Sequence, residues 1–515
     1  MTRRHFFILV FAGLLIFETC GCASAPKVRK RALRSPSQEI FKIAERKKAP
    51  SSLSPKAYAH YSMGMIYDNE GSTDQAVEEY CKAIEFDPYA AQAYYRLGSG
   101  YLKLGKVDEA VEILKKAVEL DEKNARARFL LALIYTSQKR YDEATREYEE
   151  ILKGEPDDLA TLTSLADLYI LGQDLDKAIS IYTNLAREKP DSPLIHFNLG
   201  IVYARAVKFK DAINELTTAI TLKPDYLEAH LALAVLFEIN NQLEDSAREY
   251  REAIKLDPAN PKLYRQVGQL YFQMGKIDDA IRQYELMLKM APENIAGYIE
   301  LSYICVAGSR VDEAIKILKN ALAVEERAED VHMALGFCYT EKGDNKAAIE
   351  EYKESIEINP FNPKAHFYLG AMHEEMGDRK AAILHLKRAI ELDPGDPEAL
   401  NYLGYIYAEE DENLDEADRL IRKALSISPN NGAYIDSLGW VYYKKGMFQE
   451  ARIELEKAKE LIGEDPIVYD HLGDAYFKTD SLDNAREAWE KSLELQDNVD
   501  VRKKLESISE ALGRE

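Results

Sequence analysis

The sequence predicts an all-α solenoid built from about thirteen helix–turn–helix repeats, and three observations lead to this fold class. One pattern recurs thirteen times between residues 57 and 499, and twelve of the copies are 34 residues long. Each copy carries a small residue at its eighth position and another twelve residues later, one residue late only at Ala417. Most copies also end at a proline. Such a period is typical of arrays in which each unit packs only on its neighbours, which favours an extended binding surface over a catalytic cleft.

Residues 1–22 have the composition of a targeting segment and are not expected to belong to the fold. Arg3 and Arg4 precede an unbroken run of twelve apolar residues from Phe6 to Phe17. This run is short for a bilayer span but suits a secretory signal. The two cysteines behind it resemble the cleavage region of bacterial lipoproteins, in which a cysteine is acylated after the signal has been removed.

Cys22 is the expected lipidation residue of this segment. Gly21 and Cys20 are the small residues that the lipoprotein motif has directly before its cysteine, whereas Thr19 stands where leucine is usual. Attachment through more than one acyl chain, such as palmitate, holds a protein stably on a membrane. Because Ala23 and not aspartate follows the cysteine, the resemblance to lipoprotein sorting implies the periplasmic face of the outer membrane.

Two other interpretations of residues 1–22 remain open. Ordinary secretion would require cleavage after Ala25, but Pro26 would then follow the cut, where proline resists processing. An uncleaved membrane anchor would instead keep the whole segment.

Residues 23–56 are interpreted as a basic, flexible linker. They hold four prolines, a serine-rich stretch at 51–54, and ten Lys/Arg against two Glu. Such a composition cannot bury a core. We expect a solvated spacer with some adhesion to anionic lipid headgroups, worth about 1 kcal/mol per basic residue near the surface. The remaining chain is acidic, since the protein carries a net charge of −22, and this argues against nucleic acid as a partner.

Each repeat between residues 57 and 499 is predicted to form a first helix, a short turn and a second helix. In most repeats a tyrosine such as Tyr67 follows the small eighth residue by three positions and therefore lies on the same helix face. Prolines such as Pro258 close the second helices, because proline cannot continue a helix. Five glycines in the turns are predicted to take the left-handed backbone that ends a helix: Gly105, Gly172, Gly275, Gly343 and Gly446.

This pattern resembles the tetratricopeptide repeat (TPR) family. The segments 439–446 (GWVYYKKG) and 250–258 (YREAIKLDP) match its consensus closely, and the resemblance covers about 86% of the chain. It implies a right-handed superhelix whose concave groove binds other proteins. The departures from the consensus are few, such as Glu122 or Gly463 in place of the terminal proline.

Residues 500–515 are predicted to form a capping helix. Val501, Leu505, Ile508 and Leu512 recur at spacings of four, three and four, which places them on one apolar stripe with charges opposite. The end of a solenoid must cover its last hydrophobic face, and a helix with one polar side serves this purpose.

The sequence contains no catalytic constellation. It lacks a nucleophile elbow, a phosphate-binding loop, a zinc-protease motif and a dinucleotide fingerprint, so we expect no enzyme activity, cofactor, metal or small-molecule substrate. Five histidines share the fourth position of their repeats, which indicates packing in preference to metal binding: His60, His196, His230, His332 and His366. His373 and His385 share one repeat without metal-ligand spacing. Cys81, Cys305 and Cys338 are expected to be buried apolar residues.

The concave surface of the array is the candidate functional site. By resemblance to the family, positions 2, 5, 9, 12 and 13 of each repeat line the groove. The predicted groove residues are Tyr58, Tyr61, Tyr95, Phe129, Leu133, Phe197, Ile201, Phe272, Tyr303, Phe337, Phe367, Tyr405, Trp440 and Tyr443. Any one of them can instead pack between helices, but together they predict a partner surface, because aromatic residues dominate binding hot spots. The specialised groove motifs of the family, a carboxylate clamp and an asparagine ladder, are absent.

We therefore expect a lipid-anchored scaffold that binds segments of other proteins in the bacterial cell envelope. Proteins that it resembles assist outer-membrane assembly, pilus assembly or exopolysaccharide export. The alternative is a periplasmic chaperone or adaptor that presents clients to a protease or an insertion complex. Weak and broad peptide affinity would favour that alternative, and a single stable partner would favour the scaffold.

Overall fold

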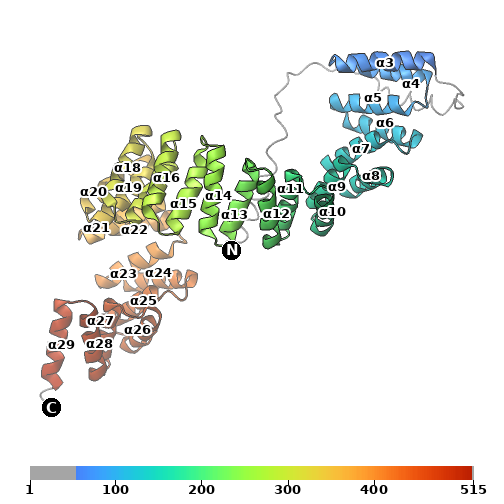
Figure 1. The fold of residues 1–515 in the computed structure, drawn as a ribbon. Helices are drawn as coiled ribbons and strands as arrows, with labels where there is room; N and C mark the ends of the chain where they lie inside the picture. Colours follow the sequence, from blue (N-terminus) through green and yellow to red (C-terminus); the bar gives the residue numbers. More distant parts are fainter. Residues whose placement is uncertain (1–53, 513–515) are drawn as a thin grey trace. The chain divides into compact units, whose positions relative to one another are not determined.

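The computed structural model describes residues 54–512, and all regular structure in this range is α-helical, as the sequence predicts (Figure 1). The predicted signal, Cys22 and nearly all of the predicted linker lie outside the described residues. Successive helices pair as antiparallel hairpins, each made of the first and second helix of one repeat. The hairpins form two compact units, which meet at residues 215 and 216 and are described separately here.

The first unit contains the first four repeats and most of the fifth. Its helices are α3 (Pro55–Asn69), α4 (Thr73–Phe86), α5 (Ala91–Lys103), α6 (Val107–Leu120), α7 (Ala125–Ser137), α8 (Tyr141–Gly154), α9 (Leu159–Leu171), α10 (Leu175–Glu188), α11 (Pro193–Arg205) and the first half of α12 (Phe209–Leu222).

The second unit begins within α12 and contains the sixth to thirteenth repeats. Its helices are α13 (Leu227–Ile239), α14 (Leu243–Leu256), α15 (Pro261–Gln273), α16 (Ile277–Met290), α17 (Ile295–Ala307), α18 (Val311–Val324), α19 (Glu329–Lys342), α20 (Asn345–Ile358), α21 (Pro363–Glu375), α22 (Arg379–Leu392), α23 (Pro397–Glu409), α24 (Leu414–Ile427), α25 (Gly432–Lys444), α26 (Phe448–Ile462), α27 (Pro466–Lys478), α28 (Leu482–Leu495) and α29 (Val499–Leu512).

The small residue at the eighth position lets the two helices of a hairpin approach closely. A methyl group added at Gly268 would lie 2.7 Å from the ring of Tyr284. Tyr284 belongs to the second helix of the same repeat and is buried at this contact. Gly473 meets the indole of Trp489 in the same way, at 2.5 Å. The recurring small residue is therefore required by the large buried side chain that faces it.

The turn inside each hairpin contains a residue with left-handed backbone at the fifteenth position of the repeat, and the longer turn of the eleventh repeat adds a second at Asn413. Gly105, Gly275, Gly343 and Gly446 take this conformation, as predicted, with φ between 73° and 77°. The prediction for Gly172 is wrong, because its φ is −78° and it belongs to the end of α9. The next residue, which is not a glycine, takes the left-handed conformation there with φ 64°. The position in the repeat thus determines which residue has the left-handed backbone, whether or not that residue is a glycine.

Val207 is the most strained residue in these turns. It has φ 60°, a conformation that costs a β-branched side chain more than most, and its side chain is 66% exposed. Few contacts offset this backbone cost.

The last helix, α29, packs on α28 with the stripe that the sequence predicts. Val501 and Ile508 are buried there, together with Trp489 of α28. Lys504 of α29 also pairs with Asp470 and Asp474 of α27, at 2.7 and 2.8 Å. The side chain of Leu512 lies outside the described residues.

Candidate functional site

The first helices of the repeats form an inner row and carry the predicted groove residues. In the first unit α5 contacts α7, and in the second unit α17 contacts α19, α23 contacts α25, and α25 contacts α27. Positions 5, 9 and 12 of a helix are neighbours on one face, so their side chains gather along this row.

Aromatic side chains touch from helix to helix along the inner row of the second unit. The ring centroids of Tyr303 (α17) and Phe337 (α19) lie 5.6 Å apart. Phe367 (α21) packs edge-on against Tyr402 (α23) at 5.9 Å. Tyr303 is 46% exposed, and Phe337 and Phe367 are half-buried. An exposed aromatic surface therefore spans neighbouring repeats, and it offers large apolar area at little loss of side-chain entropy.

Trp440 differs from the other predicted groove residues of this unit, because it is only 8% exposed. Its indole stacks on His471 of α27 at 4.0 Å and on Tyr443 at 4.9 Å, and its Nε1 donates a hydrogen bond to the Glu409 carboxylate of α23 at 2.5 Å. Trp440 thus joins three consecutive first helices, while Tyr443 and Tyr405 remain half-buried beside it.

Another predicted groove residue of this unit, Phe272 of the seventh repeat, is exposed.

A buried charge network lies behind Trp440. The Nδ1 atom of His471 is 3.1 Å from the Asp436 carboxylate, and both side chains are nearly inaccessible. Burial alone would lower the pKa of His471, but the facing Asp436 carboxylate outweighs burial and raises it. Burial also raises the pKa of Asp474, against the opposing effect of Lys504. The network fixes α25, α27 and α29 in register.

The predicted groove residues of the first unit are less continuous. Tyr58 is 70% exposed on α3, and Leu133 is exposed on α7. Ile201 on α11 is only 8% exposed and serves the core. The four other aromatic residues are half-buried on their first helices: Tyr61, Tyr95, Phe129 and Phe197.

A recurring polar contact at the fourth position was not anticipated from the sequence. In four repeats the Nδ1 atom of the histidine lies 2.6–2.8 Å from the carboxylate of a glutamate nineteen residues later, on the second helix. The pairs are His60–Glu79, His196–Glu215, His230–Glu249 and His332–Glu351. The constant spacing of nineteen was the available signal. Glu79 is consequently half-buried and paired.

Two of these imidazoles also contact the turn that precedes their own helix. The Nε2 atoms of His196 and His230 lie 2.9 and 3.1 Å from the carbonyl oxygens of Pro190 and Pro224, six residues earlier. Because a carbonyl only accepts, Nε2 donates this hydrogen bond. The rings of His196 and His230 therefore each tie three consecutive elements together: the preceding turn, the first helix that carries the ring, and the second helix. We call this position the histidine slot.

The tenth repeat departs from this arrangement. There His385 replaces the glutamate, and its Nδ1 atom lies 3.2 Å from Nδ1 of His366. His373 stacks on the ring of His385, with centroids 5.8 Å apart. Burial is the main cause that lowers the pKa of His385 to about 4, and neighbouring His366, His373 and Lys353 add to it.

The described residues offer little for metal or thiol chemistry. Among them no group of three or more His, Cys, Asp or Glu is placed to hold a metal ion. Cys305 and Cys338 are buried, and burial raises the pKa of each thiol to about 12, which keeps them protonated. Cys81 is half-buried, with its pKa raised to about 11 for the same reason. Within 54–512 no helix combines the length and the apolar composition that crossing a bilayer requires.

Comparison with solved structures gives several matches. The APC/C hetero-tetramer Cut9–Hcn1 matches with 16% identity over 88% of this chain and 96% of that chain, at a TM-score of 0.42. The MamA protein matches with 28% identity over 33% and 92%, at 0.30, and yeast Tom70 with 15% identity over 88% and 96%, at 0.34. These TM-scores are all below 0.5, and the likenesses therefore say nothing about partners. No curated protein matches the sequence at a significant level.

Family matches extend over most of the repeat region. Residues 101–160, 135–199, 267–318, 397–431, 434–465 and 467–499 match families described as tetratricopeptide repeat. Residues 64–105, 239–275, 338–377 and 375–411 match a family described as TPR repeat. Together with the helical hairpins and their packing, these matches establish that the chain belongs to the tetratricopeptide repeat family.

Proposed function

We propose that the protein is a lipid-anchored scaffold that binds other proteins in the bacterial cell envelope. The general part rests on the family, since tetratricopeptide repeats bind other proteins and are typically not enzymes. The observation that carries the proposed surface is the aromatic row of the second unit, above all the exposed Tyr303 in contact with the half-buried Phe337. Exposed aromatic side chains held on rigid helices bind a partner at low entropic cost.

The anchoring part of the proposal is supported by the sequence around Cys22. An apolar run behind two arginines and ahead of Gly21-Cys22 suits lipidation, and acyl chains would keep the scaffold at the membrane and raise its local concentration there. Replacement of Cys22 by alanine is expected to move the protein from the membrane fraction to the soluble fraction of cells. Unchanged membrane retention of the C22A variant would contradict lipidation.

The partner surface is tested by a double replacement on the inner row. Tyr303→Ala with Phe337→Ala should reduce the recovery of crosslinked partners from native membranes, read by mass spectrometry, and leave the circular dichroism unchanged. Leu384→Ala is the matched control, because Leu384 is also exposed but lies on a second helix. Equal recovery with the double variant would remove this surface from the proposal. Many weakly bound clients in place of one stable partner would favour the chaperone or adaptor alternative.

A further inference from the structure

The histidine slot has a defined chemistry, which its occupants in other repeats reveal. In the third repeat an arginine fills the slot and makes the same two contacts as the histidines. The Nε atom of Arg128 donates to the carbonyl oxygen of Glu122, six residues earlier, at 3.0 Å. Its Nη1 atom donates to the carboxylate of Glu147, nineteen residues later, at 2.6 Å. The slot thus accepts a planar side chain whose nitrogen atoms face a backbone carbonyl at one end and a carboxylate at the other.

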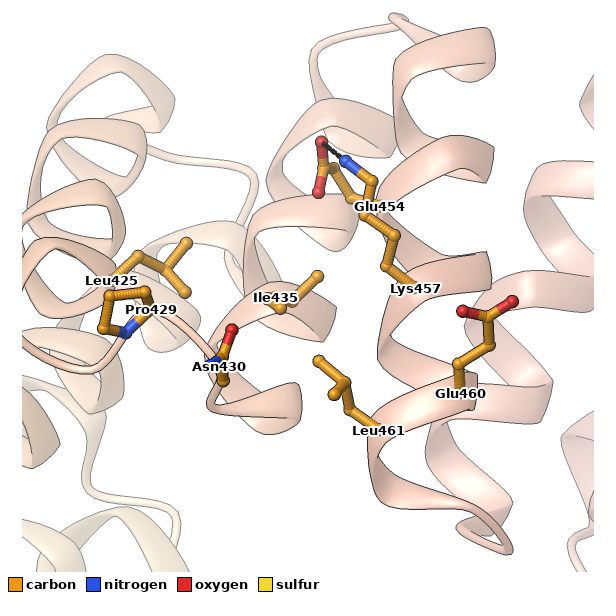
Figure 2. Close-up of a pocket in the computed structure, with 8 residues that line it drawn as sticks. All are labelled: Leu425, Pro429, Asn430, Ile435, Glu454, Lys457, Glu460 and Leu461. Atoms are coloured by element: carbon orange, nitrogen blue, oxygen red, sulfur yellow. Dashed lines mark hydrogen bonds and ion pairs between the residues drawn. The ribbon is translucent and has the colours of Figure 1, made fainter.

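In the twelfth repeat the slot keeps its acceptors but lacks the donor. Ile435 stands at the fourth position, with Pro429 six residues earlier and Glu454 nineteen residues later. A pocket of about 440 Å³ opens at this place, and these three residues line it (Figure 2). Leu425 and Leu461 form apolar walls. The short aliphatic side chain therefore leaves room beside two groups that elsewhere receive an imidazole or a guanidinium.

Glu454 already forms an ion pair with Lys457, but the first repeat shows that such an ion pair leaves the histidine slot open. Glu454 Oε1 accepts from Lys457 at 2.9 Å, an ion pair that Figure 2 marks. In the first repeat Glu79 Oε1 likewise accepts from a lysine three residues later, at 2.8 Å, while its Oε2 binds His60 at 2.7 Å. One glutamate thus serves both contacts at once. The second oxygen of Glu454 is available for the same use.

We infer that the pocket of the twelfth repeat is a binding site for an arginine side chain supplied by a partner protein. The guanidinium would donate to Glu454 and to the Pro429 carbonyl, as Arg128 does within its own repeat, and its methylene stem would pack on Leu425 and Leu461. The arginine is favoured over a neutral side chain because the carboxylate needs a charged donor for a strong bond. None of the pocket residues belongs to the inner aromatic row, so the site stands independently of the proposed groove.

The site is tested on the full chain by methyl NMR with a short peptide as the probe. The peptide acetyl-Gly-Arg-Gly-amide should shift the methyl signals of Leu425 and Leu461, with a dissociation constant on the order of 1 mM for one side chain. The same peptide with citrulline, which is isosteric and neutral, should bind at least tenfold more weakly. Equal shifts with the two peptides would overturn the proposal, since they would show that the pocket does not distinguish a charged guanidinium from a neutral side chain.

Two variants and a matched control test the residues themselves. Glu454→Gln should weaken binding of the arginine peptide at least tenfold, and Ile435→His should abolish it by filling the slot with the array's own ligand. Ile453→His places the same side chain on an exposed position of α26 outside the pocket and should bind as the unmodified protein does. Wild-type affinity in E454Q or in I435H would refute the assignment. If I435H fails to fold, E454Q and the citrulline peptide decide the question alone.

Discussion

Replacement of His385 by glutamate is expected to remove an acid sensitivity that is confined to the tenth repeat. In the unmodified protein Nε2 of His366 lies 3.3 Å from the carbonyl of Pro360, so it carries the proton and Nδ1 accepts from Nδ1–H of His385. Protonation of His366 at Nδ1 would set two N–H groups against each other, and a second proton on His385 would add the repulsion of two positive charges.

The neighbouring charges do not relieve this repulsion. Lys353 of α20 and Arg388 of α22 are both positive and lower the pKa of His385 and of His366 respectively, after the larger effect of burial. Among the described residues, the carboxylate that pairs with the cluster is that of Asp378, which lies 3.8 Å from Nδ1 of His373 and is largely exposed.

The size and sign of the effect follow from the pKa of His385. Its folded value of about 4 lies below the ordinary 6.5, so the folded repeat keeps the ring neutral while the opened repeat takes up a proton below pH 6.5. Stability is therefore complete above pH 6.5 and is lost as the pH falls towards 4. Between pH 7 and pH 5 opening of the repeat should become about 20-fold more favourable, on the order of 2 kcal/mol.

Amide hydrogen exchange of the full chain, read by mass spectrometry, checks this prediction. After correction for intrinsic exchange rates, peptides from α21 and α22 should lose protection at pH 5, while those from α13 and α14 keep it. His385→Glu restores the carboxylate of the other repeats and should remove the difference. The reciprocal Glu249→His should introduce it in the sixth repeat, beside His230. An acid response of the tenth repeat that persists in H385E would refute the reasoning.

Three further replacements test the packing of the array. Val207→Gly should stabilise the fifth repeat by about 1 kcal/mol in urea unfolding, because the left-handed backbone suits glycine and the exposed side chain contributes little; a loss of stability would show that Val207 makes contacts that matter. Gly268→Val should destabilise the seventh repeat by about 2 kcal/mol, measured by local hydrogen exchange, since its side chain would collide with Tyr284; unchanged exchange would mean that the hairpin can open without cost. Trp440→Ala should cost about 3 kcal/mol by thermal unfolding, whereas Tyr303→Ala should cost under about 1; similar losses would contradict the assignment of Trp440 to the core.

The sequence predicted the repeat and its hairpins well, because both depend on a short-range pattern that recurs many times. It failed at Gly172, where the left-handed residue is set by its distance from the helix end and not by the presence of glycine. It also placed Trp440 in the groove, since position 9 faces inward by the family pattern. Only the approach of His471 and Glu409 from two other helices buries this indole. Such three-helix contacts depend on tertiary packing that no local pattern encodes.

The sequence indicated the histidine slot only in part. Five histidines at one position indicated a structural role, but the partners stand nineteen residues away on another helix. Once the slot is known, the missing carboxylate at His385 and the missing donor at Ile435 can be identified from the sequence.

The two contacts that a side chain in the histidine slot makes, one to the preceding turn and one to the second helix, have a mechanical consequence. Where a histidine or an arginine bridges the preceding turn and the second helix, pulling the repeats apart must break two polar bonds together. Where an aliphatic residue such as Leu162 or Leu400 stands at the fourth position, separation under tension has no such bridge to rupture. An array with a uniform period can therefore be unevenly stiff, and a stretching force would part it first at its leucine junctions.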